Sequence, residues 1–180
     1  MTAAAAETGI GMARPAAAVG TARQRAWDAV ARVPDPEIPV ITIEDLGILR
    51  DLWLEEDGRV VVAITPTYSG CPAMLLIETE ILRALDKAGF PDARVETVLT
   101  PAWTTDWLGE KARAKLRAFG IAPPERASTS KRALFAEAKA DCPRCRSSDT
   151  ERVSEFGSTP CKAHYRCRAC AEPFDHFKCI

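Results

Sequence analysis

The spacing of apolar side chains between residues 21 and 120 switches between helical and strand-like periods along the chain. Apolar residues recur every three or four positions at 21–31, 73–88 and 108–119, and they alternate with polar residues at 48–56, 59–65 and 93–99. Asp57-Gly58 stands between the first two alternating segments and is typical of a two-residue hairpin turn. The predicted order is helix, hairpin, helix, strand, helix, which indicates a small α+β domain rather than a three-layer fold.

The helix expected at 73–88 has the broadest apolar stripe of the chain. Its repeating positions are Met74, Ile77, Ile81 and Leu85, and further leucines at 75, 76 and 82 widen the stripe. Because this helix is apolar over much of its circumference, we expect it to be central to the domain.

Two segments of biased composition divide the chain. Residues 1–20 are rich in alanine and lack the basic start and apolar core of a signal peptide, which predicts a disordered tail. Residues 121–140 combine Pro123-Pro124 with small polar and charged residues, the composition of a linker. We therefore predict a tail at 1–20, the α+β domain at 21–120, a linker at 121–140 and a second module at 141–180.

The module at 141–180 is too small to fold by apolar burial alone and carries two Cys-x-x-Cys pairs. Cys142-Pro-Arg-Cys145 and Cys167-Arg-Ala-Cys170 each form a knuckle that turns two thiolates toward one ion. Four thiolates in tetrahedral geometry suit a structural zinc ion, although rubredoxin-type iron uses the same ligands. With strands expected at 151–156, 163–166 and 174–178, the pattern indicates a four-cysteine zinc ribbon.

Four further residues of the module can bind metals but stand outside the two pairs: Cys161, Cys179, His164 and His176. The simplest interpretation makes the cysteines small buried residues and the histidines packing or surface residues. The alternative is that they substitute as ligands or form a labile second metal site.

The net charge of −1 and the seven cysteines restrict the partners and the compartment. Clustered cysteines in a chain without a secretion signal indicate metal ligands in the cytoplasm rather than disulfides. The near-neutral charge argues against a ribbon that binds nucleic acid. No apolar run approaches the length of a membrane span.

Cys71 lies in the loop Tyr68-Ser-Gly-Cys71-Pro72, between the strand at 59–65 and the helix at 73–88. We expect Cys71 at the N-cap and Pro72 at the first helical position. A thiol at the positive end of a helix dipole favours the thiolate, which binds metals or attacks electrophiles. The alternative is a buried structural cysteine. Both histidines lie in the ribbon, so a thiol enzyme would lack a base in the same domain.

A series of motifs in residues 21–120 resembles the small α/β family of SufT and of the cytosolic iron–sulfur targeting factors. The motifs are Asp35-Pro-Glu37-Ile-Pro39, Ile43-Glu-Asp45-Leu-Gly47, Gly70-Cys71-Pro72 and Pro101-Ala-Trp103. With the ribbon, and with Ser158-Thr-Pro-Cys161 and Phe177-Lys-Cys179-Ile near its end, the whole chain resembles the PaaD (or PaaJ) family. These are small accessory proteins of the ring-1,2-phenylacetyl-CoA epoxidase system, which degrades the aromatic compound phenylacetate in bacteria.

The resemblance implies a role in delivering or maturing metal centres, with Cys71 as the functional thiol that binds iron or an iron–sulfur cluster transiently. Asp35, Glu37 and Asp45 are the carboxylates that would act as oxygen ligands or tune the pKa of this thiol, if they lie near it. The implied partners are the subunits of the oxygenase, including a di-iron catalytic subunit and an iron–sulfur flavoprotein reductase. The sequence does not decide whether the protein forms a homodimer.

The chain carries neither a Glu-x-x-His pair for a di-iron centre nor a Gly-x-Gly-x-x-Gly segment for a nucleotide. This favours an accessory protein over an enzyme that is catalytic by itself. The alternative is a structural or regulatory subunit that stays bound to the oxygenase. Trp53, Trp103 and Trp107 would be its interface anchors, unless they belong to the core.

Overall fold

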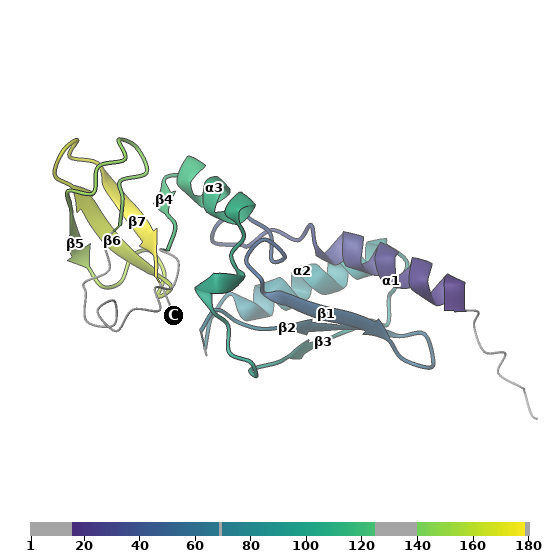
Figure 1. Cartoon of the computed structure of the whole chain (residues 1–180). Coiled ribbons are helices and arrows are strands. Elements are labelled where there is room, and N and C mark those ends of the chain that lie inside the picture. Colours follow the sequence, from purple (N-terminus) through teal and green to yellow (C-terminus); the bar gives the residue numbers. More distant parts are fainter. Residues whose placement is uncertain (1–15, 69, 125–139, 179–180) are drawn as a thin grey trace, which may run out of the picture.

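The computed structural model describes residues 16–68, 70–124 and 140–178, which form two sheets with three α-helices beside them (Figure 1). The first part contains α1 (Ala16–Val30), β1 (Leu49–Leu54), β2 (Val60–Ile64), α2 (Met74–Lys87) and β3 (Arg94–Thr97). A 3₁₀ helix (Thr105–Trp107), α3 (Glu110–Ala118) and β4 (Ile121–Ala122) follow. The ribbon contributes β5 (Thr150–Ser154), β6 (Lys162–Cys167) and β7 (Pro173–Phe177). The expected mixed α+β fold with a ribbon after it is confirmed.

The first sheet has the strand order β1-β2-β3, with β1 antiparallel and β3 parallel to the central strand β2. All five residues of β2 are buried, because strands flank it on both sides and α1 and α2 pack against the sheet. Gly58 adopts φ +85° in the hairpin that joins β1 to β2, the conformation that favours glycine at this turn. The predicted hairpin and the return strand are therefore confirmed, but the tight turn is centred on Glu56 and Asp57, and Gly58 follows it.

Helix α2 begins at Met74 and is amphipathic rather than central on all sides. Ile77, Ile81 and Leu85 are buried against the sheet, whereas Leu75 is 75% exposed and Leu76 is 47% exposed. The expected central position is thus seen on one face of the helix, which packs against α1 and β3, while leucines that widen the apolar stripe stay exposed. Gly89 ends the helix with φ +89°, as its position after the apolar stripe predicts.

Helix α1 extends further toward the amino terminus than the sequence predicted. It begins at Ala16 and continues through Thr21, where the apolar pattern begins. Alanine is the strongest helix former, so the alanines at 16–18 favour this extension of the helix. Residues 1–15, the remainder of the expected tail, lie outside the described residues. None of the described helices combines the length and apolar character needed to cross a membrane.

The second sheet has the order β4-β7-β6-β5, and its first strand comes from the stretch expected to be a linker. Ile121 and Ala122 are buried and pair in parallel with β7, so the segment after α3 completes the ribbon sheet. Arg113 of α3 is buried and donates hydrogen bonds to the carbonyl groups of Thr105, Leu108 and Pro124, which fixes this connection. Residues 125–139, which belong to the same expected linker, lie outside the described residues.

The ribbon and the first part share one hydrophobic core. Phe177 of β7 is 1% exposed, and its ring centroid lies 6.0 Å from that of Trp103. The Trp103 indole N–H donates to the carbonyl of Leu46 at 2.8 Å, so this tryptophan is a core residue. The same core includes Cys161, which immediately precedes β6.

Candidate functional sites: a four-cysteine centre and a thiol-lined cavity

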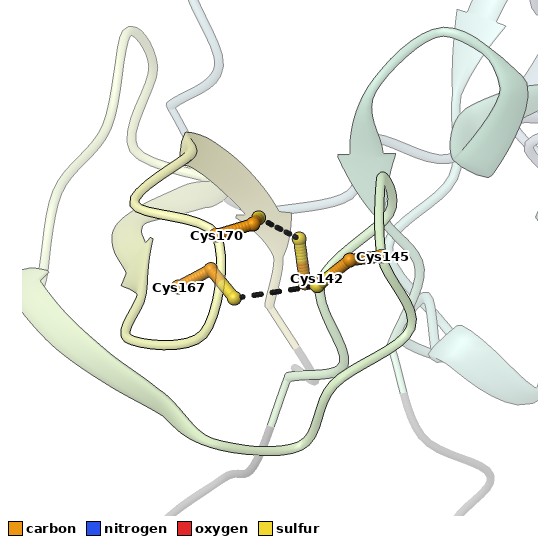
Figure 2. Close-up of side chains that lie close together, drawn as sticks. All are labelled: Cys142, Cys145, Cys167 and Cys170. Atoms are coloured by element: carbon orange, nitrogen blue, oxygen red, sulfur yellow. Dashed lines mark hydrogen bonds between the residues drawn. The ribbon is translucent and has the colours of Figure 1, made fainter.

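The cysteines of the two knuckles converge on one point at the end of the ribbon (Figure 2). The Sγ atoms of Cys142 and Cys170 lie 3.7 Å apart, and those of Cys145 and Cys167 lie 3.5 Å apart. Metal–sulfur bonds of about 2.3 Å in a tetrahedron would place the sulfurs about 3.8 Å apart. The four thiolates therefore fit one tetrahedral metal ion, and the expected four-cysteine set is the set that the fold gathers.

The backbone of each knuckle turns at the residue after its second cysteine. Arg146 has φ +65° and Ala171 has φ +62°, both in the left-handed region that ordinary side chains disfavour. The amide of Arg146 donates to the carbonyl of Cys142 at 2.9 Å, and the amide of Cys167 donates to the carbonyl of Glu172 at 2.8 Å. These hydrogen bonds close the two turns and point the paired sulfurs inward.

A second site lies where the start of α2, the proline-rich loop and the ribbon meet. A cavity of about 20 Å³ is lined there by the polar or sulfur-bearing residues Asp35, Glu37, Thr67, Cys71, Met74 and Cys161. The loop with Asp35 and Glu37 thus lies beside Cys71, which the sequence analysis had to assume. A cavity of this size has room for about one water molecule, so it is no larger than a site for a single ion held by the residues that line it.

Cys71 is half-buried and stands before the helix rather than capping it. Helix α2 has Ala73 as its N-cap, and the Met74 amide donates to the Cys71 carbonyl at 3.3 Å. The expectation that the Cys71 thiol caps the helix was wrong, because a turn at Pro72 and Ala73 separates them. The Cys71 thiol instead lies near the Tyr68 side chain, whose pKa it raises.

The pKa of Tyr68 depends on the same groups that surround the Cys71 thiol. Desolvation, the hydrogen bond to Cys71 and the negative charges of Cys71, Cys161 and Glu37 raise the pKa of Tyr68 to about 12. The phenol therefore stays protonated at neutral pH, and its O–H can donate a hydrogen bond to a Cys71 thiolate.

Asp35 holds the proline-rich loop in shape. Its Oδ1 accepts the amide N–H groups of Glu37 at 2.9 Å and of Ile38 at 2.8 Å. Burial raises the pKa of the Asp35 carboxyl, and the two amides together with the charge of Lys162 oppose that rise. One Asp35 oxygen is thus committed to the loop, whereas Glu37 is half-buried at the cavity.

Asp45, the third expected carboxylate, lies outside this cavity. The Thr42 amide donates to the Asp45 carboxylate at 3.2 Å. The Asp45 amide donates in turn to the Thr42 hydroxyl at 3.1 Å. Asp45 also pairs with Lys115 and lines an open hollow with Trp27. Partial burial acts to raise the pKa of Asp45, but Lys115 and Thr42 outweigh it and the pKa is lowered. The structure thus brings together Cys71, Asp35 and Glu37, and places Asp45 apart from them.

Cys161 was expected to be either a small buried residue or a ligand of a second metal site, and it lies buried at this cavity. It is 7% exposed, and its Sγ lies 3.1 Å from the Thr159 hydroxyl. Burial raises the pKa of the Cys161 thiol, with smaller opposing effects from Thr159 and Lys162. The sequence marked Cys161 by its position outside the Cys-x-x-Cys pairs and by the Ser158-Thr-Pro-Cys161 motif, but neither places it beside Cys71. Cys179, the other such cysteine, lies outside the described residues.

The two histidines belong to the ribbon sheet and not to the cavity. His164 lies with its Nδ1 3.4 Å from Asp175, and His176 packs its ring against Tyr165 with centroids 5.4 Å apart. The Nε2 of His176 has no hydrogen-bond partner among the described residues, and burial lowers the pKa of His176 to about 4. His176 is therefore a neutral packing residue at physiological pH.

Comparison with known proteins matches the two parts of the chain to two different families. Residues 23–100 match a family of iron–sulfur cluster assembly proteins, and residues 126–178 match the PaaD zinc beta ribbon domain. A solved structure, a domain of unknown function DUF59 from Bacillus anthracis, is 24% identical with a TM-score of 0.51. This likeness covers 57% of the present chain and 97% of that protein, and it shows the fold of the first part.

Two curated proteins resemble the sequence over different lengths. The "Fe-S protein maturation auxiliary factor YitW" of Bacillus subtilis is 34% identical over 95 residues, which are 52% of this chain and 92% of that protein. A subunit of the "Putative 1,2-phenylacetyl-CoA epoxidase" of Escherichia coli K12 is 48% identical over 154 residues. This second match covers 86% of the present chain and 91% of the E. coli protein, so it extends over both the first part and the ribbon of the present chain. The chain therefore belongs to the PaaD family, together with this epoxidase component of E. coli.

Proposed function

We propose that this protein is an accessory factor of a phenylacetyl-CoA epoxidase system in phenylacetate catabolism, and that it assists the assembly of the iron or iron–sulfur centres of that system. Cys71 is the thiol that holds the iron in transit, and the oxygenase subunits are its partners. The observation that carries the proposal is the placement of Cys71 in a cavity with the carboxylate of Glu37, within the part that matches iron–sulfur assembly proteins.

The ribbon has a separate, structural task in this account. We assign zinc to Cys142, Cys145, Cys167 and Cys170, because their sulfur spacing fits a closed tetrahedral site that leaves no open position for chemistry. Such a site stabilises a sheet that could not fold by apolar burial alone. The cargo thiol Cys71 must stay reduced to work, a condition that the cytoplasm supplies.

The proposal is tested by producing the epoxidase subunits with the wild-type protein, with Cys71→Ser, or without it. Loss of the thiol should lower the epoxidase activity nearly as far as loss of the whole protein. Met74→Leu is the matched control, because Met74 lines the same cavity and leucine conserves its volume without removing a thiol. Wild-type epoxidase activity with Cys71→Ser would refute the role of Cys71.

The second candidate function is a structural subunit that stays bound to the oxygenase. The exposed leucines of α2, Leu75 and Leu76, favour it, because they offer an apolar surface near the cavity. Purification of the oxygenase separates the two functions. A stoichiometric, salt-resistant complex favours the structural role, whereas release of the protein after iron loading favours the assembly factor.

A further inference from the structure

The fold places a second thiol in the cavity of Cys71. Cys161 comes from the ribbon, immediately before β6, and Cys71 comes from the loop between β2 and α2, yet both line the same cavity. The two thiols are close enough that the charge of Cys71 acts to raise the pKa of Cys161. Two cysteines that lie 90 positions apart in the sequence therefore face one small space.

Hydrogen bonds hold Cys161 in place at this position. The amide of Lys178 donates to the Cys161 carbonyl at 2.9 Å, and the Lys162 amide donates to the Thr159 carbonyl at 3.0 Å. Phe177, the neighbour of Lys178, packs in the core beside the cavity. The ribbon segment that contributes Phe177 to the shared core therefore also fixes the backbone of Cys161 beside the cavity that Cys71 lines.

Oxygen groups complete the surroundings of the two sulfurs. Glu37 lines the cavity, and its charge acts on both the Tyr68 hydroxyl and the Cys161 thiol. Two thiolates and a carboxylate are ligands that a ferrous ion accepts, and a tyrosine hydroxyl can donate a hydrogen bond to a ligating sulfur.

The cavity differs from the four-cysteine centre in how close together its ligand atoms lie. Within the described chain, the four ribbon cysteines form the group whose ligand atoms already lie within 4.8 Å of one another. The ligand atoms around Cys71 are near one another without being gathered to coordination distance. A site that must rearrange to bind holds its ion less tightly, which suits an ion that is to be passed on.

We propose that Cys71 and Cys161 together bind one ferrous ion, with the Glu37 carboxylate as a third ligand, so that the ribbon completes the cargo site of the first part. Each thiol releases its proton to solvent as its Fe–S bond forms, and the iron stays ferrous. This inference rests on the proposed function, in which Cys71 carries iron, and it adds that the ribbon supplies the second sulfur.

The test is an anaerobic titration of the full chain with Fe²⁺, after its four-cysteine centre has been saturated with zinc. Iron and zinc per chain are measured by mass spectrometry after equilibrium dialysis. The wild-type chain should bind one iron in addition to its zinc. Cys71→Ser and Cys161→Ser should each weaken iron binding by about tenfold or more, because each removes a ligand. As a control, Glu78→Gln removes a carboxylate of α2 that does not line the cavity, and it should bind iron like the wild type.

Retained zinc and an unchanged circular dichroism spectrum show that a variant is folded, and Cys161→Ala serves if serine disturbs the buried position. A measurement on the wild-type chain needs no substitution: Fe²⁺ should slow the alkylation of both Cys71 and Cys161 by iodoacetamide. Wild-type iron binding by the Cys161 variants, or protection of Cys71 alone, overturns the shared site and leaves the proposed role of Cys71 standing. Absence of any iron beyond the ribbon metal overturns the site outright.

Discussion

The individual residues around the cavity divide into those that shape it and those that face it with reactive atoms. Asp35 shapes the loop through two backbone amides, whereas Cys71 and Glu37 present a thiol and a carboxylate. The sequence identified all three residues because they recur in one ordered series of motifs. It could not assign their separate tasks, since these depend on which oxygen is already committed to a backbone hydrogen bond.

Asp35→Ala should destabilise the protein by about 1–3 kcal/mol, because two amide groups at a buried position lose their acceptor. Asp35→Asn keeps an acceptor oxygen and should cost clearly less. Chemical denaturation of both variants measures the difference. Equal losses for alanine and asparagine would show that the charge of Asp35, and not its loop hydrogen bonds, is what stabilises the fold.

His176 makes the stability of the protein depend on pH. Burial lowers the pKa of His176 from 6.5 to about 4, so between these values the unfolded chain binds a proton that the folded chain does not. Stability should therefore fall as the pH drops from about 6.5 to about 4, by up to about 3 kcal/mol. Denaturation curves at several pH values, compared with His176→Phe, isolate this contribution from acid release of the metal. The same acid slope in both proteins would contradict it.

At the scale of the elements, the sequence predicted every strand of the first sheet and the three ribbon strands β5, β6 and β7. It missed β4, because two apolar residues before a double proline carry no periodic signal. It also did not show that Leu75 and Leu76 of α2 are exposed, since a wide leucine stripe does not reveal which neighbours cover the helix. Both errors concern tertiary partners, which local spacing does not encode.

The knuckle turns offer a prediction about backbone strain. Ala171→Gly should stabilise the protein by up to about 1 kcal/mol, because glycine adopts the left-handed conformation of φ +62° without steric cost. Ala169→Gly is the control, since this exposed residue of the same turn has no positive φ and should lose stability. Thermal unfolding of the metal-loaded proteins gives the comparison. Destabilisation by Ala171→Gly would show that the turn is not strained.

At the scale of the whole molecule, the ribbon and the first part stabilise each other through one core. Local sequence patterns carry no sign of this, because Trp103 and Phe177 lie far apart in the chain and meet only in the folded molecule, where β4 also pairs with β7. The same docking brings Cys161 to Cys71. The second thiol of the cavity was therefore hidden from sequence analysis for the same reason as the shared core.

Removal of the ribbon metal with a chelator should destabilise the first part as well as the ribbon. The core would lose the packing of Phe177 on Trp103, and loss of one buried aromatic costs about 3–5 kcal/mol. Tryptophan fluorescence should shift to longer wavelength, and readdition of zinc should reverse the shift. An unchanged unfolding midpoint of the first part after chelation would show that the two parts are independent.

The central claim is that the Cys71 thiol delivers iron to the epoxidase system, and iron content tests it most directly. The oxygenase is purified from cells that also produce the wild-type protein, Cys71→Ser or Met74→Leu, and iron per oxygenase is measured with its activity. We predict iron-depleted, poorly active oxygenase with Cys71→Ser and fully loaded oxygenase with the other two. Full iron content with Cys71→Ser would contradict the claim.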